Sequence, residues 1–334
     1  MTAGRALIID RPGTFRLDDI DPGPPGPGEV LVQVAYTGIC GSDREIVSGG
    51  RDPALVRYPV IPGHEWSGTV IEAGDGVERS LIGRRVVGEN HHNCGWCDNC
   101  RRGETVLCEG GYDETGFTRP GAAAETVLVP ARQLHLLSDD ADLRAAALIE
   151  PAACMAAATL AARIVPGERV AIVGGGTLGL LATQLAAACG PADLMVVDPR
   201  SRSVATVCGA TETVTPEAAR GSHGRFDVVI EAAGAHGTGR LAVELTRRGG
   251  RTVLTGLHGG PDKDLHPAAL VAAAVTVHTV FGAPPRAWIH AVRAFTAGVL
   301  RPEPLISDEL TLDRVGLTLR PDSPSPSGKV LLRP

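Results

Sequence analysis

Three glycines in the second half of the chain constrain its fold more than any other feature. Gly174, Gly176 and Gly179 form the pattern G-x-G-x-x-G directly after the apolar segment RVAIV. A helical pattern then runs from Leu178 to Cys189. Glycines between a strand and a helix allow a tight turn that brings the helix N-terminus against a pyrophosphate. A packing turn without a ligand is the alternative interpretation.

Strand and helix patterns alternate through the region after Pro151. The strand-like segments LMVVD, FDVVIEAAG, RTVLTG and TVHTV are separated by helical stretches, and a further helix is expected between Trp288 and Ala297. Such alternation predicts a parallel sheet with helices packed on it. We therefore predict an α/β domain of the Rossmann type, a doubly wound parallel sheet, over residues 151–298.

The same region carries residues suited to a nicotinamide dinucleotide. Asp198 ends the segment MVVD, where a carboxylate can accept hydrogen bonds from both ribose hydroxyls and would repel a 2′-phosphate. This favours NAD, although Arg200 and Arg202 follow closely and could accommodate the phosphate of NADP. The residues expected to bind the cofactor are Gly174, Gly176, Thr177, Leu178, Gly179, Asp198 and Arg200.

The region before Pro151 has a different texture. Short β segments such as ALIID, EVLVQVAY, GTVIEAG, RRVVGE and AETVLVP are broken by glycine and proline. They predict a small, barrel-like β domain over residues 1–150. The last part of the chain, residues 299–334 ending in GKVLLRP, is expected to return to it. Two domains suit a chain of 334 residues.

Charge and hydropathy exclude several classes of protein. The formal net charge is -6 and no basic block is present, so nucleic acid is not an expected partner. No apolar run reaches the roughly 18 residues of a membrane span, because the stretch from Ala145 to Ile164 contains Glu150 and Arg163. The N-terminus MTAGRALIIDRPG does not resemble a signal peptide. We expect a cytoplasmic protein with no membrane partner.

Four of the eight cysteines are close together. Cys94, Cys97, Cys100 and Cys108 form C-x2-C-x2-C-x7-C, a spacing that lets one loop place four thiolates around a tetrahedral ion. Because four thiolates leave no open position, zinc there would be structural. An iron–sulfur cluster and unligated cysteines are the alternatives.

A second set of potential metal ligands is scattered along the chain. Cys40 lies in GICGSD, His64 and Glu65 lie in PGHEWSG, and Glu150 lies in LIEPAA. Catalytic zinc takes about three protein ligands, commonly from distant segments, and keeps one position for substrate. Glycine or proline beside each candidate would end a segment and turn the side chain inward.

These motifs, in this order and over nearly the whole chain, resemble the medium-chain, zinc-containing alcohol and polyol dehydrogenase family. The resemblance implies a GroES-like β-barrel catalytic domain beside the Rossmann domain, and two zinc ions per chain. It implies Cys40, His64 and Glu150 as catalytic zinc ligands, with Glu65 exchanging against water as substrate comes and goes. Other branches of the family place a cysteine at position 150, and the glutamate of this chain resembles the polyol branch. A carboxylate in place of a thiolate would make the zinc site harder in the sense of ligand chemistry.

The segment GSD suggests a path for the substrate proton. In a zinc site Ser42 is placed to accept the hydroxyl proton, because zinc lowers the pKa of a bound alcohol. Asp43 would support a metal ligand from behind. Many members of the family carry a histidine three residues after this serine, whereas this chain has Glu45. Either Glu45 or water must then complete the relay.

The substrate class rests on resemblance. VIPGHEWSGTV and GFTRPGAAAE are similar to aminocyclitol dehydrogenases of aminoglycoside antibiotic biosynthesis. This implies hydride transfer between a nicotinamide and a secondary alcohol of a cyclitol, aminocyclitol or amino sugar. The side chains that could touch it are Trp66, His91, His92 and Glu114.

Other interpretations stay open at this point. Sorbitol-like polyols and L-threonine are competing substrates within the same fold. A non-catalytic member of the family would lack zinc ligands, and a zinc-free quinone reductase would not need the four cysteines. The resemblance also implies a homodimer or homotetramer, for which the segment TVHTV could supply an edge strand.

Overall fold

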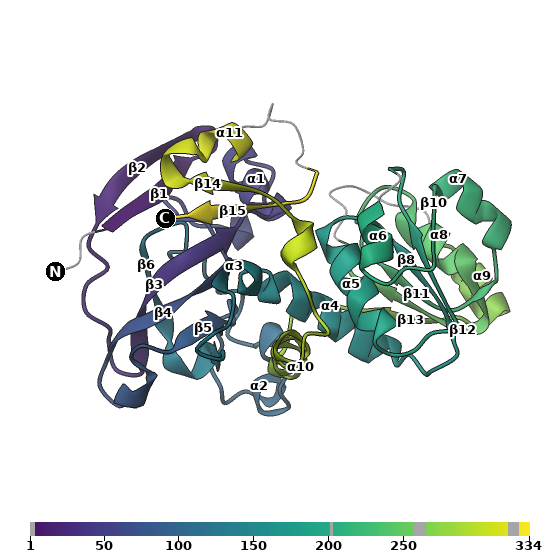
Figure 1. The fold of residues 1–334 in the computed structure, drawn as a ribbon, viewed down its shortest axis with the longest axis horizontal. Coiled ribbons are helices and arrows are strands. Elements are labelled where there is room, and N and C mark those ends of the chain that lie inside the picture. Colours follow the sequence, from purple (N-terminus) through teal and green to yellow (C-terminus); the bar gives the residue numbers. More distant parts are fainter. Residues whose placement is uncertain (1–3, 201–202, 257–264, 320–326) are drawn as a thin grey trace. The chain divides into compact units, whose positions relative to one another are not determined.

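The computed structural model describes residues 4–200, 203–256, 265–319 and 327–334. Arg202 and most of the proline-rich segment 321–328 therefore lie outside the described residues. The chain forms two compact units, one of residues 1–150 with 306–334 and one of residues 151–305 (Figure 1). No helix in the described ranges has both the length and the apolar character needed to cross a bilayer.

The first unit is built on a seven-stranded sheet and a β-hairpin. Strand β3 is central, because it pairs with β4 on one side and with β6 and β15 on the other. The strands are β1 (Gly4–Arg11), β2 (Thr14–Ile20), β3 (Glu29–Gly38), β4 (Glu65–Ala73), β5 (Arg85–Gly88), β6 (Thr126–Pro130), β7 (Leu134–Leu136), β14 (Ile306–Thr311) and β15 (Lys329–Arg333). The helices are α1 (Gly41–Ser48), α2 (Asp98–Arg101), α3 (Leu143–Ala146) and α11 (Gly316–Leu319).

Alternation of apolar residues explains this sheet. Val30, Val32 and Val34 of β3 point to one face, where they pack with Val70 of β4 and Val86 of β5. The five β segments predicted in this region correspond to β1, β3, β4, β5 and β6. Strand β2 was not predicted, because most of its residues are exposed and it shows no apolar alternation.

The second unit contains a six-stranded parallel sheet in the order β10-β9-β8-β11-β12-β13. This is the strand order of a Rossmann fold, and it confirms the predicted parallel sheet. The strands are β8 (Arg169–Val173), β9 (Asp193–Val197), β10 (Glu212–Val214), β11 (Phe226–Glu231), β12 (Thr246–Leu254) and β13 (Thr276–Thr279). The helices are α4 (Ile149–Ala162), α5 (Thr177–Ala187), α6 (Ser203–Val207), α7 (Pro216–Ala219), α8 (Thr238–Leu245), α9 (Pro267–Ala273) and α10 (Pro285–Thr296).

Two details of the second unit differ from expectation. Strand β10 was not predicted, because three residues between two short helices carry no readable period. Residues 299–305, predicted to return to the first domain, lie in the second unit. Gln184 of α5 binds the backbone of Arg301 in this segment. Its side-chain amide donates to the carbonyl of Arg301 at 3.0 Å and accepts from the backbone N–H of Arg301 at 2.6 Å.

Candidate active site

The antiparallel pairing of β3 with β4 brings the scattered ligand candidates together. Gly38 at the end of β3 lies opposite Glu65 at the start of β4, so the segments that carry Cys40 and His64 are neighbours. One donor atom each from Cys40, His64 and Glu65 lies within 4.8 Å of the others. A thiol, an imidazole and a carboxylate at this spacing suit a zinc ion.

Asp43 holds the two loops of this set. Its carboxylate accepts hydrogen bonds from the backbone N–H of Cys40 at 2.8 Å and of Gly63 at 3.3 Å, and it lies 3.6 Å from the Nδ1 atom of His64. Burial would raise the pKa of Asp43, but the His64 ring and these N–H groups lower it below its usual range. Gly63 has a φ of 96°, and a side chain there would collide with the backbone of Ala123.

Ser42 lies on the first turn of α1 beside the same ring. Its hydroxyl oxygen is 3.5 Å from the Nε2 atom of His64. Since Asp43 faces Nδ1, the two nitrogens of this imidazole have different surroundings, which fixes the ring orientation. The serine hydroxyl is therefore next to the metal ligand candidates, as an acceptor of a substrate proton must be.

Glu65 and Glu150 have different surroundings. The carboxylate of Glu65 is buried and lies 2.7 Å from the ammonium of Lys329, which comes from β15. Glu150 begins α4 and is outside the group of donors within 4.8 Å of one another. The pKa of Glu150 is raised to about 8, chiefly by burial; the His64 ring lowers it, and the charges of Glu65 and Glu114 raise it. A carboxylate in such a position suits a nearby cation.

The four-cysteine loop is a separate metal site. None of the eight cysteines, all of which the structure describes, forms a disulfide, and the sulfur atoms of Cys94, Cys97, Cys100 and Cys108 lie within 4.8 Å of one another. Backbone N–H groups donate to two of these sulfurs, as from Cys97 to Cys94 at 3.3 Å and from Cys94 to Cys108 at 3.4 Å. Hydrogen bonds lower the pKa of Cys97 to about 6, which favours the thiolate. This geometry fits a closed, structural zinc site.

The glycine turn lies at the carboxyl end of β8. Gly174 has a φ of 111°, and a Cβ on Gly179 would collide with the carbonyl oxygen of Gly174. Gly176 is the N-cap of α5, so Thr177, Leu178 and Gly179 form the first turn of that helix. The helix N-terminus is thus open to an anion, as dinucleotide binding requires.

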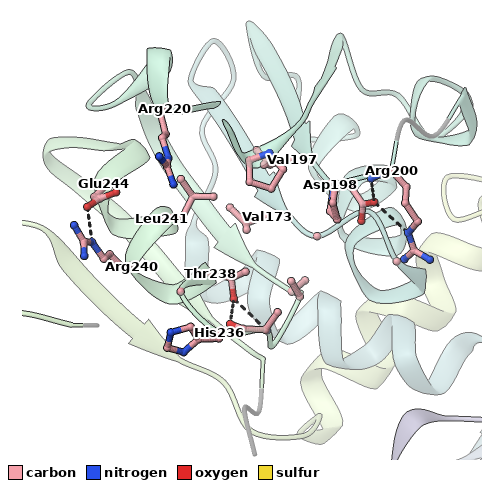
Figure 2. A pocket seen from close by; sticks show the side chains of 18 of the residues that line it. Val173, Val197, Asp198, Arg200, Arg220, His236, Thr238, Arg240, Leu241 and Glu244 are labelled. Carbon is pink, nitrogen blue, oxygen red and sulfur yellow. Dashed lines mark hydrogen bonds and ion pairs between the residues drawn. The ribbon is translucent and has the colours of Figure 1, made fainter. Parts of the chain in front are cut away.

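A cavity of about 940 Å³ lies beside this turn, within the second unit. Gly174, Gly176, Asp198 and Arg200 line it, whereas Gly179 serves close packing. Asp198 is buried and accepts hydrogen bonds from the backbone N–H of Gly175 at 2.8 Å and of Arg200 at 2.9 Å. Figure 2 shows Arg200 next to Asp198 at one end of the cavity.

Comparison with known proteins matches a different family model to each half of the chain. Residues 26–139 match the model of the alcohol dehydrogenase GroES-like domain, and residues 177–297 match the model of the zinc-binding dehydrogenase. An L-threonine 3-dehydrogenase of Streptomyces avermitilis is 32% identical over 293 residues, which are 83% of this chain and 84% of the relative. The chain belongs to the zinc-dependent medium-chain alcohol dehydrogenase family.

Two further relatives show the breadth of this dehydrogenase family. A 2-dehydro-3-deoxy-L-galactonate 5-dehydrogenase of Pseudoalteromonas atlantica is 31% identical over 91% of this chain and 91% of its own. A zinc-binding dehydrogenase structure from Sinorhizobium meliloti, bound to NADP, has a TM-score of 0.93 and 30% identity, with both chains covered fully. This chain is accordingly a zinc-dependent, NAD(P)-linked dehydrogenase of alcohols or polyols, and the GroES-like and Rossmann assignments are confirmed.

One substrate contact predicted for this dehydrogenase is wrong. Trp66 is only 2% exposed and packs with Val70 and Val86 in the core of the sheet. Its place follows from strand alternation, since Trp66, Gly68 and Val70 share one face of β4, opposite to the face of Glu65.

His92, another predicted substrate contact, has a partner within the protein. Its ring shares a hydrogen bond of 2.9 Å with the hydroxyl of Thr115, and burial lowers the pKa of His92 to about 4.

Several side chains near the zinc set were missed by sequence reasoning. Lys329 is 264 residues from Glu65, and nothing in GKVLLRP marks its lysine as buried. Phe117 stacks on His64 with ring centroids 4.8 Å apart, and the guanidinium of Arg51 lies 4.2 Å from the centroid of Phe117. The proline and glycine residues around these side chains indicate turns in the sequence. The sequence does not indicate that these side chains come together near the zinc set.

Proposed function

We propose that this dehydrogenase interconverts a secondary alcohol and a ketone on a cyclitol, aminocyclitol or amino sugar, as in aminoglycoside biosynthesis. Catalytic zinc would be held by Cys40, His64, Glu65 and Glu150, and structural zinc by the four-cysteine loop. The observation that carries the proposal is the convergence of Cys40, His64 and Glu65 within 4.8 Å, next to the hydroxyl of Ser42.

The residues of this site have separate tasks in the proposed reaction. When bound, zinc lowers the pKa of an alcohol, and a nicotinamide ring accepts a hydride from its carbon. Ser42 accepts the hydroxyl proton through its Oγ atom. Asp43 keeps His64 oriented, and Lys329 offsets the charge of Glu65 whenever that carboxylate is not a ligand.

The ring-alcohol substrate is supported by the segments VIPGHEWSGTV and GFTRPGAAAE and by the carboxylates near the zinc set. Glu114 is buried, and its charge acts on Glu150. The competing candidate is L-threonine, because the relative from Streptomyces avermitilis carries that activity in its name. L-Threonine, like an aminocyclitol or an amino sugar, is a secondary alcohol with an amino group.

For the cofactor we propose NAD, with the glycine turn and the first turn of α5 against the pyrophosphate. Asp198 supports NAD, whereas Arg200 and the NADP in the relative from Sinorhizobium meliloti keep NADP as the alternative. We also propose a homodimer or homotetramer, for which β13 at the edge of its sheet offers a pairing strand. A cytoplasmic location stays a prediction.

A substrate screen tests the proposal directly. The zinc-loaded enzyme is assayed with cyclitols, aminocyclitols, amino sugars, sorbitol and L-threonine, each with NAD and with NADP, by absorbance of the reduced nicotinamide. We expect the highest kcat/KM with an aminocyclitol and NAD. Turnover of L-threonine alone would replace the ring substrate by the alternative, and a higher kcat/KM with NADP would reverse the cofactor assignment.

A further inference from the structure

Glu114 is a buried carboxylate that the proposed mechanism does not use. It is 7% exposed and forms an isolated antiparallel bridge with His91. One of its carboxylate oxygens accepts a hydrogen bond from the hydroxyl of Tyr112. The other oxygen lies 3.5 Å from the Nε2 atom of His91.

No lysine or arginine among the described residues pairs directly with Glu114. The nearest link to a cation runs through Tyr112, whose hydroxyl accepts from Arg51 at 2.9 Å and donates to Glu114. Arg51 itself lies 3.6 Å from the carboxylate of Glu45. A buried carboxylate is costly without a full counter-charge, so a cation that reached Glu114 would be stabilised there.

The surroundings of Glu114 connect it to the zinc set within the same unit. Arg51, which donates to Tyr112, covers one side of Phe117, and Phe117 packs on His64. Glu114 is therefore linked to His64 by a chain of side-chain contacts through Tyr112, Arg51 and Phe117.

The contacts of Glu114 also fix its orientation. Tyr112 and His91 approach different carboxylate oxygens, so rotation of the carboxyl group is restricted before any substrate binds. Burial and the charge of Glu114 raise the pKa of Tyr112 far above its usual value, so the phenol stays a proton donor. A carboxylate held in this way is preorganised to accept a charged N–H group.

We infer that Glu114 binds the ammonium group of the substrate and makes this dehydrogenase selective for amino alcohols over the corresponding polyols. The inference rests on the proposed function, because it places a substrate beside the Cys40, His64 and Glu65 set. An ammonium supplies a permanent counter-charge and donates charge-assisted hydrogen bonds, whereas a hydroxyl at the same place supplies only a neutral donor. The alkyl carbons of the substrate would face Phe117.

Two substrate pairs that differ only in an amino or a hydroxyl group test this inference. The pairs are scyllo-inosamine with scyllo-inositol, and L-threonine with 2,3-dihydroxybutanoate. They are assayed at about pH 7.5, where an aliphatic amine is protonated. The wild-type enzyme is expected to prefer the amino member of at least one pair. In Glu114→Gln we expect kcat/KM for that member to fall about 10- to 100-fold, mostly through KM, since a charge-assisted bond becomes a neutral one.

Controls separate recognition from folding. Glu72→Gln removes an exposed carboxylate from β4 and should change neither member of a pair by more than about twofold. Glu114→Asp keeps the charge on a shorter side chain and should retain part of the preference for the amine. The hydroxyl member should be turned over by Glu114→Gln within about threefold of wild type, which also reports an intact fold.

The outcomes distinguish this inference from the proposed function. Equal loss for both members of a pair in Glu114→Gln, or no amine preference in the wild type, overturns the role of Glu114. Turnover of neither ring compound overturns the ring substrate, and the threonine pair then tests Glu114 alone. If Glu114→Gln does not fold, a reduced amine preference in a folded Glu114→Asp variant supports the inference, and unchanged preference in that variant contradicts it.

Discussion

The two predicted zinc sites of the first unit are built in opposite ways. The four cysteines come from residues 94–108, a segment with one short helix, and Trp96 within it is 71% exposed. Cys40, His64 and Glu65 come from a helix cap and the start of a strand, and Lys329 of β15 completes their surroundings. The first site is local in sequence and near the surface, whereas the second is assembled by the sheet and largely buried.

This difference separates what each site needs from the fold. A loop without an apolar core of its own depends on its metal for order. A site made from distant strands exists once the sheet has formed, and its polar residues are held by hydrogen bonds such as those of Asp43. Loss of a metal ligand should therefore appear mainly as lost stability in the loop and mainly as lost activity in the buried set.

Cys40→Ser is expected to have the largest effect. Replacement of the thiolate removes a ligand from the buried set, so kcat/KM should fall on the order of a thousandfold or more. Zinc content, measured by plasma emission spectroscopy, should fall from about two to about one ion per chain. Cys154→Ser, at a cysteine outside both metal sets, is the matched control. Full activity with unchanged zinc content would remove Cys40 from the site.

Lys329→Met should act mainly on the stability of the buried site. Loss of the ammonium leaves the carboxylate of Glu65 buried without its 2.7 Å partner, and breaking such a pair costs about 3 kcal/mol of unfolding free energy. Denaturant unfolding of the metal-free protein measures it. Lys329→Arg, which keeps the charge, should recover part of the loss. Equal stability of the Met variant and wild type would show that the pair is not needed.

Cys100→Ser should show the contrasting behaviour of the loop. The lost thiolate opens the four-cysteine site, and we expect a decrease of about 2 kcal/mol in unfolding free energy. At low temperature, kcat/KM should stay within about threefold of wild type, because the buried set is intact. A thousandfold loss of activity with full stability would contradict the division of tasks between the two sites.

The sequence predicts the local features of both sites and much of the fold. The spacing of the four cysteines and the glycines between β8 and α5 are short-range patterns, and each was readable without any tertiary contact. Strand and helix alternation likewise predicted the parallel sheet. The alternation of Trp66 with Val70 was also present in the sequence and should have placed this tryptophan in the core rather than against the substrate.

Long-range pairings could not be predicted in the same way. Lys329 meets Glu65 only because β15 pairs with β3, and no local period encodes that pairing. The same holds for Arg51 and Tyr112, which meet 61 residues apart in sequence. Glu150 stays a predicted ligand by family resemblance, because it is not among the three donors that lie within 4.8 Å of one another.

Glu45→Gln is expected to have the smallest effect on kcat and on stability. It tests whether the proton relay extends from the buried set to Glu45. Glu45 stands where many family members carry a histidine, but its side chain is 55% exposed and lies 3.6 Å from Arg51. A long pair with one exposed partner contributes less than about 1 kcal/mol, so stability should hardly change. Because water reaches this carboxylate, we expect water to complete the proton relay and kcat to stay within about twofold. A tenfold fall in kcat that Glu45→His reverses would instead make Glu45 the last proton acceptor, and would extend the catalytic set to the surface.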